Sequence, residues 1–233
     1  MPSLPRYLVL TNKSLFHVTW QCHNREFHLQ HDWAKKKYYD LLLKYKDKYH
    51  IKIFSYCFMS NHPHITGYVD DKKNLSDFFR IVNALFARFY NKIMNRRGQL
   101  VMDRFKSPVI ETQPDLLKVM YYIDLNPKRA RMVKHPKEYA WTSFHHYAYG
   151  KNDPLVTHPD CYLNLGESAT ERQNTYLSMI EEILKNDWKE KKKYSFECFI
   201  GNPEWVTMRY IQLRQNIRER QHFKKMQTIH PPT

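Results

Sequence analysis

Apolar and polar positions alternate in a way that divides the first seventy residues into strands and one helix. Residues 14–22 (SLFHVTWQC) are rich in β-branched and aromatic side chains and predict a first strand. From about Asp32 to Tyr49, apolar residues recur at helical spacing with lysines between them, which predicts an amphipathic helix. Residues 51–59 and 62–69 predict two further strands, and because proline cannot donate a ladder hydrogen bond, Pro63 should lie at a strand start.

The next segments extend this pattern to a complete α+β unit. Apolar residues repeat every three or four positions over 75–93, which predicts a helix that Asn74 would cap. A short strand over 108–112 and a helix from Pro114 to Asn126, which Pro127 should stop, follow. The order β-α-β-β-α-β-α predicts an α+β fold close to the ferredoxin-like (RRM-like) arrangement, an antiparallel sheet with helices on one face.

The chain changes character after residue 150. Residues 150–159 predict a loop, Ser168 to about Lys185 a charged helix, and Glu204 to Lys225 a basic helix, while the lysine-rich run at 189–193 is typical of a solvated surface. We therefore predict two parts, a domain over residues 1–150 and a basic, mostly helical C-terminal extension over 151–233.

The charge adds a class of partner to this picture. The chain has 233 residues, of which 42% are hydrophobic, so it can bury a core. Lys and Arg number 38 against 23 Asp and Glu, a formal charge of +15, which favours a polyanion and nucleic acid first. A membrane surface and a merely basic protein are the alternatives. The 17 Tyr, 13 Phe and 5 Trp lie among the basic residues, as base stacking requires.

Cysteine spacing and the N-terminus bear on location. The four cysteines are far apart and form no CxxC pair, which is typical of free thiols in a reducing compartment. The first residues contain no apolar signal segment, and no apolar run is long enough to cross a membrane. We expect a cytoplasmic protein.

Two pairs of side chains suggest chemistry. His62 and His64 are two residues apart, so in a strand they point to the same side and could bind one metal ion, although two exposed polar residues would have the same spacing. Tyr122 and Asn126 lie one helical turn apart, whereas Tyr121 points about a quarter-turn away and is better placed for packing. An amide oxygen can be a third ligand for a hard divalent ion, and a phenol can attack phosphorus.

Five motifs, in order, carry a resemblance to a known family. They are His17-Val18-Thr19, Met59-Ser60-Asn61-His62-Pro63-His64, Gly98-Gln99-Leu100 with Asp103-Arg104-Phe105-Lys106-Ser107, Tyr122-Ile123-Asp124-Leu125-Asn126-Pro127-Lys128-Arg129-Ala130, and Trp141-Thr142-Ser143-Phe144. Over residues 15–149 the chain resembles the REP-associated tyrosine transposases, a branch of the single-tyrosine HUH transposases within the HUH endonuclease superfamily.

The resemblance implies an activity and a site. It implies that residues 1–150 form the HUH domain, that His62, His64 and Asn126 hold Mg²⁺ or Mn²⁺, and that Tyr122 is the nucleophile. Members of this family cleave single-stranded DNA near a small hairpin, leaving a 5′-phosphotyrosine link and a 3′-hydroxyl that can rejoin the strand.

Several basic residues are candidates for DNA contact. Arg104, Lys106, Lys128 and Arg129 lie beside the motifs, and Arg214 and Arg218, one turn apart, could touch phosphates together. Solvated surface charge is the plain alternative for each. His17, His23, His145 and His146 are expected to be structural or to contact DNA, not to bind metal.

Two other functions fit parts of the sequence. A non-catalytic, domesticated DNA- or RNA-binding protein with the same fold would explain the charge and the aromatic residues but leaves both side-chain pairs as coincidence. A metal-dependent hydrolase would need further His and Asp ligands at strand ends, which the sequence does not provide. A monomer and a homodimer are both compatible with the sequence.

Overall fold

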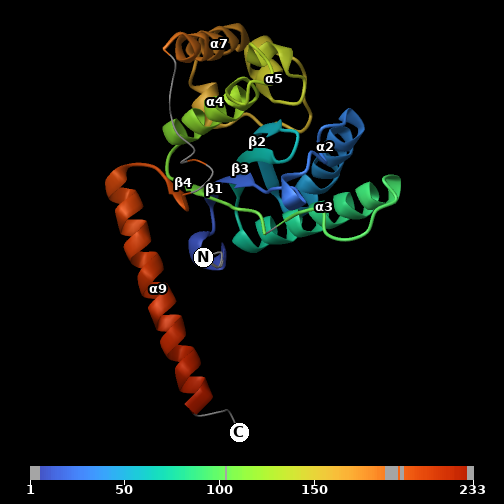
Figure 1. Ribbon diagram of the computed structural model, residues 1–233. Coiled ribbons are helices and arrows are strands. Elements are labelled where there is room, and N and C mark those ends of the chain that lie inside the picture. The colour runs from blue at the N-terminus through green and yellow to red at the C-terminus, as the bar shows by residue number, and fades with distance from the viewer. Residues whose placement is uncertain (1–5, 103, 187–193, 195–196, 230–233) are drawn as a thin grey trace.

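A five-stranded sheet forms the centre of the computed structural model, which describes residues 6–102, 104–186, 194 and 197–229 (Figure 1). The strands are β1 (Ser14–Thr19), β2 (Ile51–Phe58), β3 (Pro63–Val69), β4 (Val109–Ile110) and β5 (Phe199–Ile200), in the order β2-β3-β1-β4-β5. β1 is antiparallel to β3 and β4, β2 is antiparallel to β3, and β5 is parallel to β4. The first four strands therefore have the ferredoxin-like order that the sequence predicts.

Two long helices cover one face of this sheet. They are α2 (Asp32–Lys46), continued by the 3-10 turn η2 (Asp47–Tyr49), and α3 (Lys72–Ile93). Phe16, Val18 and Ile65 point toward this side and form one buried cluster with Phe78 and Phe86 of α3. The apolar stripe of the strongest predicted helix is thus core.

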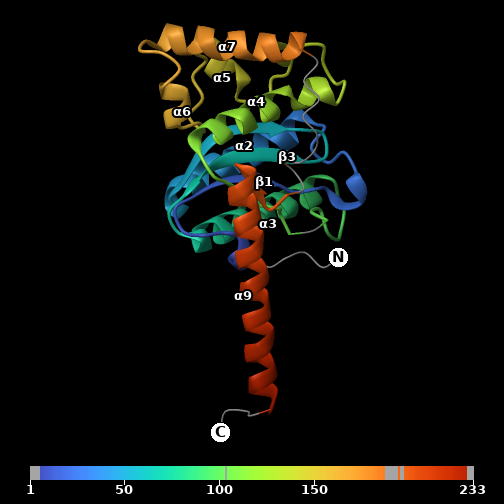
Figure 2. The same ribbon diagram turned by 90° about the vertical axis from the view of Figure 1, so that its left-hand side faces the viewer.

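The opposite face carries a second helical layer. Here α4 (Gln113–Arg129) packs on β2 and β3, and α5 (Phe144–Tyr149), α6 (Asp160–Leu163) and α7 (Ala169–Lys185) lie beyond it (Figures 1 and 2). Phe54 and Cys57 of β2 join Met120 of α4 in a second buried cluster. The α+β class is confirmed, and α2 and α3 lie on one face as predicted, but the structure adds a second helical layer on the other face. The strands bury apolar side chains on both faces, and β2 changes register between Ile53 and Ser55.

The predicted element order β-α-β-β-α-β-α is confirmed, with two corrections at helix ends. Asp71, not Asn74, caps α3, and its carboxylate accepts a hydrogen bond from the Lys73 amide. α4 does not stop before Pro127 but continues to Arg129, and the Ala130 amide donates to the Asn126 carbonyl. A proline near the last turn removes one amide donor, and burial of Pro127 against the rest of the protein offsets that loss.

The first part of the C-terminal helix packs against the core. The predicted charged helix is α7, which Ser168 caps with a complete capping box, and the predicted basic helix is α9 (Pro203–Ile229). Leu213 is buried, and Arg209 donates to the Val9 carbonyl at the end of α1 (Arg6–Val9), so this end of α9 is anchored. The rest of α9 extends away from the sheet (Figures 1 and 2).

Phe199 belongs to the same cluster as the first strands, and the division at residue 150 stays a prediction. The charge run at 189–193 lies outside the described residues. The 3-10 turns η1 (His23–Arg25) and η3 (Pro136–Glu138) complete the element order. Across the part of the chain described here, no helix has both the length and the apolar character needed to cross a membrane.

Candidate active site

Strand pairing directs two histidines toward α4. In the antiparallel β1–β3 pair, Thr19 is opposite His64 and His17 is opposite Thr66. Because side chains alternate along a strand, and Val18 and Ile65 face α3, His17 and His64 face the other side. Pro63 occupies the first position of β3, so it withholds no donor from the interior of the sheet.

Three histidines form one cluster, His17 of β1, His64 of β3 and His62, which directly precedes β3. The ring centroids of His62 and His64 are 4.8 Å apart, and His17 Nε2 lies 3.0 Å from His64 Nδ1. His17 is fully buried, His64 is 2% exposed and His62 is partly buried. His17 was expected to be structural or DNA-contacting. The only signal for its place in the cluster is the alternation along β1, which becomes useful once the pairing with β3 is known.

Tyr122 of α4 lies against this cluster. Thr112 caps α4, and Tyr122 lies on the side of the helix that faces the sheet. Its ring centroid is 5.8 Å from that of His64 and 6.2 Å from that of His17. Its side chain is 4% exposed. Segments that are more than fifty residues apart in the sequence thus bring a phenol and imidazoles together.

Tyr121 points elsewhere, as the helical geometry predicts. Its ring contacts that of Tyr176 in α7, with centroids 5.0 Å apart, within the second buried cluster. Burial raises the pKa of the Tyr121 phenol above its ordinary value, which opposes the loss of a proton. Tyr121 therefore has the surroundings of a packing residue.

The electrostatics of the cluster favour uncharged imidazoles. Burial lowers the pKa of His62 to about 4 and that of His17 to about 4. Burial, followed by the neighbouring His62 and His17, holds the pKa of His64 well below its ordinary value. Neutral imidazole is the form that binds metal ions. The Arg129 guanidinium lies 4.7 Å from the centre of the Tyr122 ring and brings a positive charge to the phenol.

Asn126 fits the role of an oxygen ligand. It lies one turn after Tyr122 on α4, and its Nδ2 atom is buried without a hydrogen-bond partner among the described residues. Turning the amide by 180° would place Oδ1 there instead. The described residues contain no group of three or more His, Cys, Asp and Glu suited to a metal ion. A divalent ion here would therefore need both imidazoles, an amide oxygen and oxygens from DNA or water; the oxygens suit Mn²⁺ and Mg²⁺, and the two imidazoles favour Mn²⁺ of the two.

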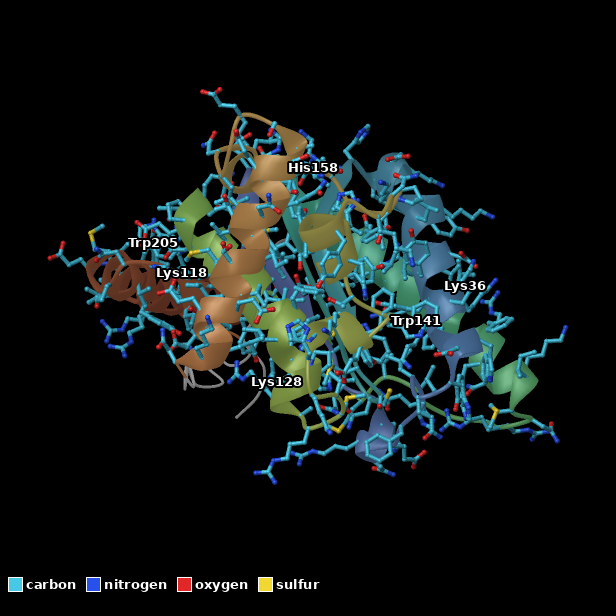
Figure 3. The ribbon with its side chains drawn as sticks, turned by 90° about the horizontal axis from the view of Figure 1, so that it is seen from above. Lys36, Lys118, Lys128, Trp141, His158 and Trp205 are labelled. Atoms are coloured by element: carbon cyan, nitrogen blue, oxygen red, sulfur yellow. The ribbon has the colours of Figure 1, made fainter. Side chains whose placement is uncertain are left out.

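Some of the predicted DNA contacts lie near this cluster. The Lys106 backbone pairs with Thr19, the residue opposite His64, and Lys106 and Arg104 are both exposed. Lys128 lies at the end of α4, well apart from Trp205 at the start of α9 (Figure 3). Arg214 and Arg218 are exposed on α9, in the stretch where Leu213 and Ile217 pack against the core, and Figure 1 shows this helix apart from α4.

Tyr194 is a neighbour that sequence reasoning missed. Its ring centroid is 5.1 Å from that of Tyr122, and its carbonyl oxygen lies 2.8 Å from His17 Nδ1. Tyr194 is 2% exposed. No motif includes it, and its position depends on the path of the chain between α7 and β5, which local sequence patterns do not predict.

Comparisons with known proteins agree with this architecture. Residues 11–126 match the family model described as "Transposase IS200 like". The fold is similar to that of a solved structure described as the REP-associated tyrosine transposase bound to a REP hairpin, with a TM-score of 0.54 and 19% sequence identity over 68% of this chain and 93% of that chain. A search of curated proteins gave no match. The resemblance carried by the five motifs is thus confirmed for residues 11–126, which match the IS200-like transposase family.

Proposed function

We propose that the protein is a transposase-like endonuclease that cleaves and rejoins single-stranded DNA near hairpin, REP-like sequences. One observation carries the proposal. The Tyr122 ring lies 5.8 Å from that of His64, in a cluster that also contains His62. The match of residues 11–126 to the IS200-like transposase family and the fold shared with a hairpin-bound transposase support the same activity.

In this proposal Tyr122 is the nucleophile. Its oxygen attacks the scissile phosphorus, the Oη–P bond forms, and the bond from phosphorus to the 3′ oxygen breaks. The phenol gives up its proton, and the departing 3′ oxygen takes up one to become a hydroxyl. The same hydroxyl can attack the phosphotyrosine and restore the strand, so no nucleotide cofactor is required.

The surrounding residues would bind and orient the phosphate. His62, His64 and Asn126 would hold Mg²⁺ or Mn²⁺, which when bound polarises a phosphate oxygen. Arg129, beside the Tyr122 ring, would offset the negative charge on the phenol and the phosphate. The Tyr194 ring packs against the Tyr122 ring, with centroids 5.1 Å apart, and would help to hold the phenol in place.

Covalent adduct formation tests the proposal. Hairpin oligonucleotides with single-stranded flanks of random sequence, labelled at the 3′ end, are incubated with protein and Mn²⁺ and run on a denaturing gel. A 5′-phosphotyrosine link retains the 3′ label on the protein, whereas a 5′ label leaves on a shortened strand.

Two variants assign the reaction to one tyrosine. Tyr122→Phe should form no adduct, while Tyr121→Phe, a substitution of the neighbouring buried tyrosine, should form it. Binding of the hairpin without any adduct from the wild-type protein would instead favour a non-catalytic DNA-binding protein.

A further inference from the structure

The buried imidazole of His17 has a hydrogen-bond partner at each ring nitrogen. It is fully buried, and both of its ring nitrogens have partners, the Tyr194 carbonyl oxygen at Nδ1 and His64 Nδ1 at Nε2. The two imidazole planes are only 22° apart. His17 therefore connects a backbone carbonyl to the ring that lies against Tyr122.

Hydrogen-bond chemistry determines where the protons lie in the series Tyr194 carbonyl, His17 and His64. A carbonyl oxygen only accepts, so His17 Nδ1 must carry the hydrogen that lies between it and the Tyr194 oxygen. A neutral imidazole has one N–H, so His17 Nε2 is an acceptor. His64 Nδ1 must then donate to it, which leaves the lone pair of His64 on Nε2.

A second series of hydrogen bonds of the same kind ends at His62. Asn61 donates from Nδ2 to the Arg25 carbonyl oxygen at 3.1 Å, so its Oδ1 is oriented toward His62. Oδ1 lies 2.6 Å from His62 Nδ1 and must receive a hydrogen from it. His62 is thereby also left with its lone pair on Nε2. Two independent series of hydrogen bonds, each beginning at a backbone carbonyl, thus give His62 and His64 the same tautomer.

We propose that His17 is a positioning residue that holds His64 in the tautomer whose Nε2 lone pair can bind a divalent metal ion. The inference rests on the proposed function, in which His62 and His64 are metal ligands. A partner on the far nitrogen of a ligating histidine fixes the ring and increases its basicity, and loss of such a partner typically weakens metal binding about 10- to 100-fold. A purely structural His17 would fill space without affecting metal affinity.

Two measurements test this role, one of the His64 tautomer and one of Mn²⁺ affinity. Long-range ¹H–¹⁵N spectra of the metal-free wild-type protein show which nitrogen of His64 is protonated, with His64→Ala for assignment. Mn²⁺ binding is measured from the electron paramagnetic resonance signal of the free ion. The variants are His17→Phe, His17→Gln and a control, His146→Phe. His146 forms a similar chain on the surface, from the Lys151 carbonyl at 2.9 Å to His158 Nε2 at 2.8 Å.

We expect His64 to be protonated on Nδ1 in the wild-type protein. His17→Phe should weaken Mn²⁺ binding by about 10- to 100-fold. His17→Gln should recover part of the loss because its amide oxygen can accept from His64, and His146→Phe should bind Mn²⁺ like the wild type. A proton on His64 Nε2, which needs no variant to detect, would overturn the inference, as would unweakened Mn²⁺ binding by His17→Phe. A wild-type protein that binds no Mn²⁺ would instead contradict the proposed function.

Discussion

His64 has a different neighbour on each side, the imidazole of His17 and the phenol of Tyr122. In the proposed site, the contact with His17 determines which His64 nitrogen can bind a metal ion, and Tyr122 is the residue that would react with DNA. A residue in this position should matter for cleavage far more than for DNA affinity.

Substituting His64 tests that separation. His64→Ala should lower hairpin cleavage more than about 100-fold, because it removes a metal ligand from the proposed site. Hairpin binding should change little, because contacts of basic residues with phosphates dominate affinity. Cleavage and binding are measured on the same labelled hairpin. A parallel loss of both would refute the separation.

Arg129 is the second residue whose role can be isolated. Arg129→Gln should slow single-turnover cleavage by about 100-fold, because a cation aimed at developing negative charge is lost from beside Tyr122. Lys128→Gln, one position earlier, is the matched control and should change the rate much less. Equal effects of the two substitutions would show that only general positive charge matters.

At the scale of elements, α4 is held in place by a buried carboxyl group. Asp124 is fully buried and accepts hydrogen bonds from Thr142 at 2.6 Å, Ser143 at 3.3 Å and Tyr176 at 2.7 Å. Burial raises the pKa of Asp124 to about 7, and the three hydroxyl groups oppose that shift. These bonds connect the helix that carries Tyr122 to α7 and to the segment before α5.

The raised pKa of Asp124 predicts a pH-dependent stability. Between the ordinary value of 3.8 and about 7, the folded protein retains a proton that the unfolded chain releases. The free energy of unfolding of the wild type, relative to Asp124→Asn, should therefore be greatest near pH 4 and fall by a few kcal/mol as the pH rises to 7. Urea unfolding of both proteins from pH 4 to 8 measures it. A difference that is independent of pH would contradict the assignment to Asp124.

α9 carries the other element-scale prediction. If its exposed arginines touch phosphates, replacing Arg214 and Arg218 together with Gln should reduce the slope of log affinity against log salt by about 0.7 to 0.9 for each phosphate that the protein no longer neutralises. Lys36→Gln on α2, a cation already paired with Asp40, is the control (Figure 3). An unchanged salt slope would remove α9 from the DNA interface.

Elements were predictable where a local pattern determines them. The apolar repeat of α3 and the capping box of α7 each depend on residues a few positions apart. The packing of a second helical layer on the sheet was not predictable in this way. The register shift in β2 between Ile53 and Ser55 interrupts the alternation of its side chains, and Phe54 joins the cluster on the second face. The end of α4 was predicted too early, at Asn126, because the burial of Pro127 that stabilises the last turn depends on the whole fold.

At the scale of the whole molecule, the site combines three distant parts of the chain. The spacing of Tyr122 and Asn126 predicts that they share one helix face, and the spacing of His62 and His64 predicts that their side chains lie together, and both arrangements are present in the structure. The place of His17 could not be predicted, because its proximity to His64 depends on the pairing of β1 with β3. Tyr194 depends on a chain path after α7 that carries no motif.

In the proposed reaction, Tyr122 forms the covalent bond to DNA. Mass spectrometry of the protease-digested and nuclease-digested adduct measures this directly, because the peptide that keeps a 5′-linked nucleotide can be sequenced. We predict the nucleotide on Tyr122, with the released strand ending in a 3′-hydroxyl. A nucleotide on Tyr121 or on any other residue, or a 3′-linked nucleotide, would contradict the account.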